Sequence, residues 1–162
     1  MTRANRKLVI LAIIAAALVA AVLIVGRREY LRHPPALTGI NPSDVTHIEL
    51  DIPPIAPQVF ERHTDGWQRV KPSDARANDT RVQRLARLAA TPVARWIPAT
   101  KITPAKVGLA HPSATLEVNG TRLEYGGLTA IGNFRYVRVD GKIALVPRQY
   151  SPEVTLTKNG KE

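Results

Sequence analysis

The segment QVFERHTDGWQRV, residues 58–70, decides the fold class that this chain is expected to adopt. Two short runs with apolar residues flank Thr64-Asp65-Gly66, and an Asp-Gly pair between such runs is a strong hairpin signal. Trp67 follows directly, and a side chain of its size supplies much of the apolar burial in a small domain. We therefore expect a β-hairpin here with Trp67 in the core.

Further strands and turns surround this hairpin. Runs that alternate apolar and polar residues indicate strands with one buried face, and Asn-Gly or Asp-Gly pairs indicate tight turns between antiparallel neighbours. Gly126-Gly127 is expected to form a turn between strands. The predicted strands are residues 48–52, residues 93–97, the pair 114–118 and 122–125 around Asn119-Gly120, and the pair 134–139 and 142–146 around Asp140-Gly141.

One amphipathic helix is predicted after a polar loop at residues 71–78. Asp79 or Thr80 can cap it, because short polar side chains accept hydrogen bonds from the unpaired N–H groups of the first turn. Apolar residues then recur at helical spacing on one face. We expect this helix to cover a mostly antiparallel, twisted sheet, which makes the fold class α+β. The expected core includes Trp67, Leu85, Leu88, Leu116 and Val118.

Three arginines, Arg81, Arg84 and Arg87, are spaced along the side of this predicted helix that borders its apolar face. A solvated face beside the core stripe explains the spacing. A basic ridge that contacts lipid phosphate or a partner protein explains it as well. The sequence leaves both interpretations open.

An apolar segment near the N-terminus predicts a membrane anchor. Residues 8–25 read LVILAIIAAALVAAVLIV and would span roughly 27 Å as a helix, close to the thickness of the hydrocarbon layer. A cleaved signal peptide and a buried core helix are the alternatives. A signal peptide has a shorter apolar region of about 7–15 residues, and Arg27-Arg28 follow this one almost directly. We expect an uncleaved single-pass anchor at residues 8–26.

The flanks of this segment suggest its orientation. Residues 1–7 carry basic side chains, and so does the segment after the span. The positive charges on the two flanks therefore nearly balance, and they do not decide the orientation alone. A short N-terminal tail before a large C-terminal domain is the usual layout of a signal anchor. We therefore expect a bacterial inner-membrane protein with residues 1–7 in the cytoplasm and the domain in the periplasm. The side chains expected at the lipid head groups are Arg27, Arg28, Tyr30 and Arg32.

Small residues within the span suggest a second role for it. They let two helices approach closely in lipid, where packing drives association. Alanine is also simply common in bacterial anchors, which is the alternative explanation. Ala12, Ala16 and Ala20 form one small-residue ridge, and Ala17 and Ala21 form a second one beside it.

Charge and composition limit the remaining function classes. The net charge is +10, and residues 1–33 and 34–162 each contribute +5. Lysines and arginines are not clustered with interleaved aromatics, so we expect no nucleic-acid partner. The chain has no cysteine, which excludes disulfides and thiolate zinc sites. We expect a linker at residues 27–43, the α+β domain at 44–150 and a loose tail at 151–162.

The order of these motifs resembles the bacterial domain-of-unknown-function family numbered 4340. Its members show a DGW hairpin, a short helix, a GL-x-x-P-x-x-T-L segment and a G…RYV strand pair. Roughly residues 45–150 take part, including Asp65-Gly66-Trp67, Val107-Gly108-Leu109, His111-Pro112, Tyr125-Gly126 and Arg135-Tyr136-Val137. The resemblance implies a single-span envelope protein related to auxiliary membrane subunits associated with ABC transporters, including those of gliding motility, and implies no catalytic residues.

No pattern in the sequence indicates catalysis, a cofactor or a metal. His33, His47, His63 and His111 lack metal-ligand spacing, and no nucleophile elbow or phosphate loop is present. We expect a non-enzymatic accessory subunit that contacts lipid and a larger integral membrane protein. The alternative is a periplasmic ligand- or cell-wall-binding module serving a transporter, for which a pocket lined by Trp67, Trp96 or Tyr125 is expected.

Overall fold

The computed structural model describes residues 13–24 and 35–152. The chain divides into two units, Met1–Pro35 and Ala36–Glu162. Residues 13–24 of the first unit are helical and exposed. Within the described residues, no helix is both long and apolar enough to cross a membrane.

Several residues of the predicted anchor lie outside the described part of the chain. Ala16, Ala17, Ala20 and Ala21 belong to the helical residues 13–24 and are exposed. The residues outside the description are Ala12 and the expected head-group residues Arg27, Arg28, Tyr30 and Arg32.

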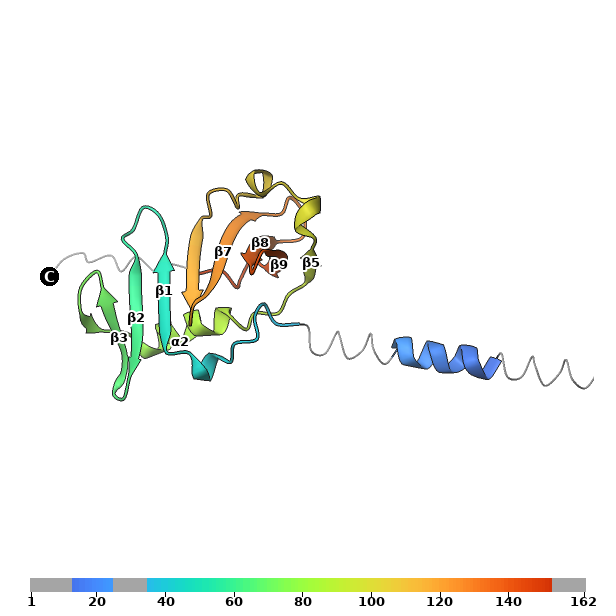
Figure 1. The fold of residues 1–162 in the computed structure, drawn as a ribbon, viewed down its shortest axis with the longest axis horizontal. Helices are drawn as coiled ribbons and strands as arrows, with labels where there is room; N and C mark the ends of the chain where they lie inside the picture. The colour runs from blue at the N-terminus through green and yellow to red at the C-terminus, as the bar shows by residue number, and fades with distance from the viewer. Residues whose placement is uncertain (1–12, 25–34, 153–162) are drawn as a thin grey trace, which may run out of the picture. The chain divides into compact units, whose positions relative to one another are not determined.

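A single sheet of nine strands forms the second unit, with the order β4-β3-β2-β1-β6-β7-β8-β9-β5 (Figure 1). All neighbouring strands pair antiparallel. This confirms the predicted α+β class. The strands are β1 (His47–Asp51), β2 (Gln58–His63), β3 (Gly66–Lys71), β4 (Ala75–Arg76), β5 (Arg95–Ile97), β6 (Ala114–Val118), β7 (Thr121–Leu128), β8 (Phe134–Val139) and β9 (Lys142–Pro147).

The three predicted hairpins are confirmed as β2–β3, β6–β7 and β8–β9. Asn119 and Gly120 have φ of 47° and 82°, and Asp140 and Gly141 have φ of 48° and 72°. Two successive positive φ values belong to the turns that match the twist of antiparallel strands. The Asn-Gly and Asp-Gly pairs therefore set the register within the β6–β7 hairpin and within the β8–β9 hairpin.

The core lies between one face of the sheet and the helix α2 (Asp79–Leu88). Helix α2 buries Val82, Leu85, Ala86 and Leu88. Three 3-10 turns complete the unit: η1 (Pro42–Asp44), η2 (Ala99–Lys101) and η3 (Pro104–Val107). The five side chains expected in the core, Trp67, Leu85, Leu88, Leu116 and Val118, are all at most 7% exposed.

The N-terminal cap of α2 differs from the expected one. Asn78 caps the helix, and its side-chain oxygen accepts a hydrogen bond of 3.0 Å from the Arg81 backbone N–H. Asp79 does not serve as the cap because its carboxylate accepts a hydrogen bond from the backbone of Trp67 instead. The polar loop expected at residues 71–78 also contains a short strand, β4, which pairs with β3.

The prediction of a turn at Gly126-Gly127 is wrong. Both glycines lie within β7, where the register with β8 shifts between Tyr125 and Leu128. A Cβ atom on Gly126 would lie 2.5 Å from the backbone oxygen of Val107. The glycines are therefore explained by the close approach of η3 to the strand, and not by a reversal of the chain.

The globular unit includes residues that the sequence assigned to the linker and to the tail. Leu37 is 3% exposed, and its N–H donates to the Thr91 oxygen at 2.8 Å. Ser151 and Pro152 are half-buried. The expected linker at residues 27–43 therefore overlaps the folded unit from Ala36 onward, and the expected tail overlaps it at residues 151–152.

Candidate functional site

Hydrogen bonds and ion pairs connect the hairpin β2–β3 to the start of α2. The Trp67 N–H donates to Asp79 Oδ1 at 2.8 Å, and the Ala77 N–H donates to the Trp67 oxygen at 2.9 Å. The Arg76 guanidinium lies 3.5 Å from the Asp65 carboxylate and 3.3 Å from that of Asp79. These contacts fix the position from which α2 runs across the sheet.

Glycine at position 66 is required by this junction. Its φ is 124°, in a region that L-residues rarely occupy. A Cβ atom there would also lie 2.6 Å from Arg76 Nη2 and 2.9 Å from Asp79 Oδ1. The Gly66 of the sequence motif therefore serves the contact with the helix as well as the turn.

The same contacts explain the charge state of Asp79. The hydrogen bond from Trp67 holds the pKa of this carboxyl below its usual value. Partial desolvation opposes the shift, and the positive charge of Arg76 adds to it. Asp79 is therefore an ionised group that links the hairpin to the helix.

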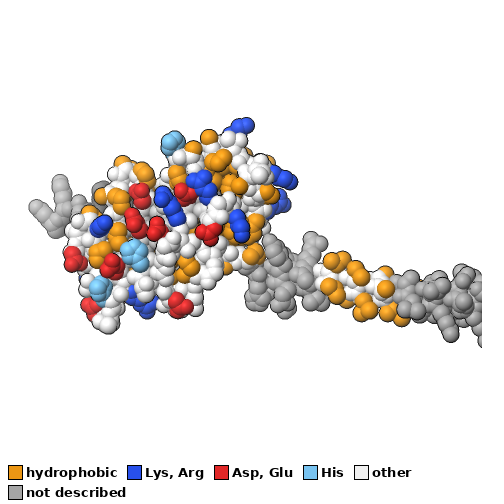
Figure 2. All heavy atoms as spheres, viewed as in Figure 1, with side chains coloured by type: hydrophobic (Ala, Val, Ile, Leu, Met, Phe, Trp, Pro, Cys, Tyr) orange, Lys and Arg blue, Asp and Glu red, His pale blue; other side chains and the backbone are white. Residues whose placement is uncertain are grey.

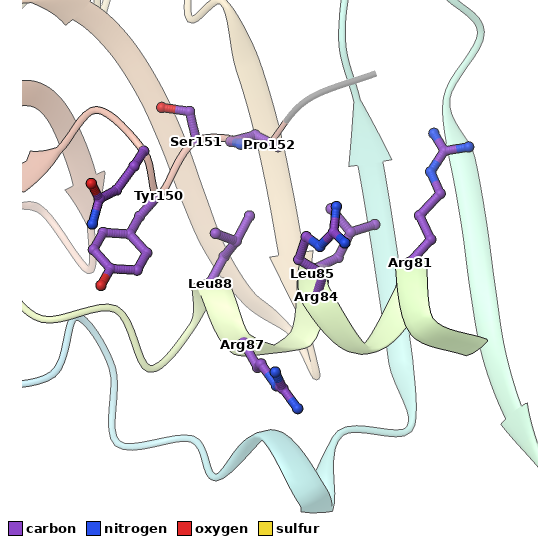
Figure 3. A pocket seen from close by; sticks show the side chains of 9 residues that line it. Arg81, Arg84, Leu85, Arg87, Leu88, Tyr150, Ser151 and Pro152 are labelled. Atoms are coloured by element: carbon purple, nitrogen blue, oxygen red, sulfur yellow. The ribbon is translucent and has the colours of Figure 1, made fainter. Parts of the chain in front are cut away.

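A groove runs between α2 and residues 149–152, which we name the strap (Figure 3). Its volume is about 380 Å³. Leu85 and Leu88 point from the helix toward Ser151 and Pro152, so the apolar face of α2 forms part of the lining. The groove therefore offers apolar contact between two segments that are 60 residues apart in the chain.

The predicted basic ridge lies along this groove. Arg81, Arg84 and Arg87 all contribute to its lining. In Figure 3, Arg87 points away from the strap, while Arg81 extends to the same side as the leucines. None of the three forms an ion pair with a carboxylate within the described residues. The structure thus brings the expected basic side chains to the border of an apolar groove.

Short-range hydrogen bonds hold the strap. The Tyr150 N–H donates to the Pro147 oxygen at 3.0 Å, and the Ser151 hydroxyl donates to the Arg148 oxygen at 2.9 Å. Tyr150 packs against the core, which anchors this turn after β9. The sequence did not predict this segment, because it has neither apolar periodicity nor a turn signal.

A second hollow of about 230 Å³ lies on the core face of β6, β7 and β8, next to the strap. Tyr125 lines it and is 1% exposed, and its hydroxyl has no hydrogen-bond partner in the described part of the chain. Burial raises the pKa of this hydroxyl, against the opposing charge of Arg135, so it stays protonated. Tyr125 thus presents a buried hydroxyl group without an acceptor.

Arg135 lines the same hollow. Its Nη1 donates to Ser113 Oγ at 2.9 Å and to the Gly126 oxygen at 2.7 Å. Its buried Nε has no partner among residues 35–152. Burial, with a contribution from the charge of Arg148, lowers the pKa of this guanidinium. Sequence reasoning missed this residue, although alternation with Val137 and Val139 places Arg135 on the core face.

The other aromatic residues considered for a ligand pocket contribute to packing. Trp67 is 3% exposed within the core cluster, and Trp96 packs against that cluster while partly buried. Of the three residues expected to line a pocket, Tyr125 is the one that the structure places beside the hollow just described.

The opposite face of the sheet is polar and carries both signs of charge (Figure 2). Glu49 lies directly opposite Glu117 across β1 and β6, and both line a small hollow of about 60 Å³ with Arg122. Within residues 13–24 and 35–152, no group of three His, Asp or Glu side chains is placed to hold a metal ion. This face therefore presents charged side chains of both signs around a small hollow.

Comparison with known proteins found no matching family model, no matching curated protein and no matching solved structure.

The junction between the hairpin and the helix predicts a pH-dependent stability. Because the pKa of Asp79 is lower in the folded state, its carboxylate stabilises the fold fully above the unfolded pKa of about 3.9. This contribution is lost as the pH falls through the folded pKa. Asp79→Asn should therefore destabilise the protein more at pH 7 than at pH 2, as measured by urea unfolding of the full chain in mild detergent with tryptophan fluorescence.

Asp74→Asn is the matched control, because Asp74 is exposed in the loop before β4. Its effect should be small at both pH values. A loss of stability in Asp79→Asn that stays the same at pH 7 and pH 2 would contradict the role of the ionised carboxylate.

Proposed function

We propose that this chain is a membrane-anchored, non-enzymatic accessory subunit of a larger bacterial inner-membrane complex. Its domain holds an acidic segment of an integral membrane partner in the groove between α2 and the strap. The observation that carries this proposal is the combination of an apolar groove lining with three arginines that lack ion-pair partners within the described residues.

The chemistry of the groove favours a peptide that carries both apolar and acidic side chains. Leu85 and Leu88 are only 5% and 7% exposed, so most of the apolar contact area, in a volume of about 380 Å³, comes from Tyr150, Pro152 and the aliphatic parts of the arginines. Arg81 and Arg84 provide planar guanidinium groups, which bind carboxylates in a bidentate manner. A peptide that satisfies both features would lie along α2 with its carboxylates on the arginine side.

The rigidity of α2 supports a preformed docking surface. The helix is capped by Asn78, and its first turn is tied to the hairpin through Asp79. Its inner side is buried against the sheet. A surface on a fixed element loses little conformational entropy when a partner binds, which favours affinity.

The membrane part of the proposal rests on the sequence of residues 8–26. We propose that this segment spans the inner membrane once, with residues 1–7 in the cytoplasm and the α+β domain in the periplasm. In support, residues 13–24 are helical, and the apolar run continues on both sides of them. Its alanines at positions 12, 16, 20, 17 and 21 provide small-residue ridges suited to packing beside a helix of the partner.

The resemblance to the family numbered 4340 stays a prediction, and it agrees with an envelope location. The lipid contacts of Arg27, Arg28, Tyr30 and Arg32 are likewise part of the proposal, because they follow from the position of the span.

The docking proposal predicts charge-dependent recovery of a membrane partner. Tagged full-length protein, isolated from membranes in mild detergent and analysed by mass spectrometry, should bring along one integral membrane protein in stoichiometric amount. The double variant Arg81→Glu and Arg84→Glu should recover at least about tenfold less of it, since like charges now face the acidic segment.

The matched control is the double variant Arg95→Glu and Lys142→Glu, which makes the same charge change at exposed positions outside the groove. It should recover the partner at the unmodified level. Full recovery by the groove variant would contradict docking at α2. Recovery of the protein alone, even after gentle cross-linking, would favour the alternative of a periplasmic ligand- or cell-wall-binding module serving a transporter.

The membrane proposal predicts a defined labelling pattern. The chain has no cysteine, so single cysteines can report on each side of the membrane. With a membrane-impermeant maleimide applied to cells whose outer membrane is permeabilised, Ala130→Cys should be labelled and Asn5→Cys should be labelled only after lysis. Ala130 is exposed in the loop after β7, so its cysteine is open to the reagent. The reverse pattern, or release of the protein by alkaline extraction, would contradict the anchor as proposed.

A further inference from the structure

The hollow beside Tyr125 and Arg135 has the features of a binding site for an anionic group. We propose that it binds a carboxylate, which accepts hydrogen bonds from the Tyr125 hydroxyl and from the Nε edge of the Arg135 guanidinium. Both side chains line the same hollow on the core face of the sheet. The proposal is independent of the docking groove, because neither residue contributes to the lining of that groove.

The two groups are donors that the described residues leave unused. A buried hydroxyl without an acceptor loses its hydration on folding and gains no hydrogen bond in return, which destabilises the fold. The Tyr125 hydroxyl is in this position, and so is the Nε of Arg135. A ligand oxygen in the hollow would supply the acceptor that each of them lacks.

The remaining hydrogen bonds of Arg135 orient its free edge. Its Nη1 is held by Ser113 Oγ and by the Gly126 oxygen. Ser113 Oγ in turn donates to the Tyr125 backbone oxygen at 3.0 Å. The guanidinium is therefore fixed on one side by Ser113, which precedes β6, and by Gly126 of β7, while its buried Nε has no partner among the described residues. A guanidinium held in this way is suited to a planar, bidentate acceptor.

The electrostatic surroundings select an anion. Arg135 forms no ion pair with a carboxylate within the described residues. The charge of Arg148 lies close enough to act on the Arg135 guanidinium. Two positive charges and a hydroxyl donor in a partly desolvated site attract a negative ligand and repel a cation.

Charge and shape favour a carboxylate over a phosphate. The hollow measures about 230 Å³, so either group fits and size does not decide between them. A singly charged planar group loses less hydration than a doubly charged tetrahedral one when it enters a buried site. One guanidinium edge and one hydroxyl also match the two oxygens of a carboxylate.

The strap covers this site. Ser151 and Pro152 line the hollow beside Tyr125, and they also line a neighbouring hollow that contains Arg135 and Arg148. A carboxylate can therefore approach from the side of Arg148, where the surface is open and basic.

Acetate is the probe that tests this proposal. Thermal unfolding of the full-length protein in dodecyl maltoside should show a melting temperature that rises saturably with acetate, at an ionic strength held constant with sodium chloride. Tyr125→Phe should weaken the apparent Kd for acetate about tenfold, because it removes one hydrogen bond to a charged group. Arg135→Lys should weaken it at least as much, because lysine keeps the charge but lacks the planar edge.

Two control variants separate this site from general effects of charge and tyrosine content. Tyr136→Phe removes a hydroxyl from the residue that follows Arg135, whose side chain lies on the other face of β8. Arg122→Lys changes an exposed arginine on β7. Both should bind acetate like the unmodified protein. Tyr125→Phe removes only an unpartnered hydroxyl and keeps the ring in the core, so it should melt at or above the unmodified temperature without acetate.

The outcomes that overturn the proposal are distinct. Equal melting temperatures in acetate and chloride, together with no broadening of the carboxyl resonance of ¹³C-labelled acetate, would show that the hollow takes no carboxylate. An unchanged Kd in Tyr125→Phe would place acetate elsewhere. Inorganic phosphate binding more tightly than acetate would contradict the choice of a carboxylate. None of these results depends on whether a membrane partner is recovered.

Discussion

The hydrogen bond between the Trp67 backbone and the Asp79 carboxylate is the interaction on which the rest of this domain depends. It joins the first long hairpin to the only amphipathic helix that the described residues contain, across 12 positions of sequence. Arg76 reinforces it by lying between Asp65 and Asp79. With its start fixed there, α2 covers the core face, and its three arginines border the groove.

The strap extends this arrangement to the other half of the sheet. Helix α2 covers the core face beside β1 and β2, and residues 149–152 return over the face formed by β6, β7 and β8 (Figure 1). Ser151 and Pro152 border both the groove and the hollow beside Tyr125. The two surfaces for which recognition is proposed thus share one covering segment: an apolar and basic groove on one side, and a donor-lined hollow on the other.

Much of the sheet could be predicted from the sequence because its turns use Asp-Gly and Asn-Gly pairs, whose backbone preferences act locally. The failures involve long-range contacts. Gly126-Gly127 has the composition of a turn. It lies within a strand, however, and η3 approaches that strand so closely that only residues without a side chain fit there. Asn78 caps the helix because the carboxylate of the neighbouring Asp79 accepts a hydrogen bond from the Trp67 backbone N–H. The strap and the meeting of Arg135 and Tyr125 at one hollow depend on contacts between segments that are distant in sequence, which no local pattern specifies.

The central claim is that the groove between α2 and the strap is a docking surface for a membrane partner. Photo-cross-linking tests it most directly, with a benzophenone amino acid placed at Gln149, which lines the groove and leaves the arginines intact. In membranes, this position should yield one cross-linked integral membrane protein, and the same amino acid at the exposed Thr64 in the β2–β3 turn should yield none. Cross-links from Thr64 but not from Gln149 would contradict the account.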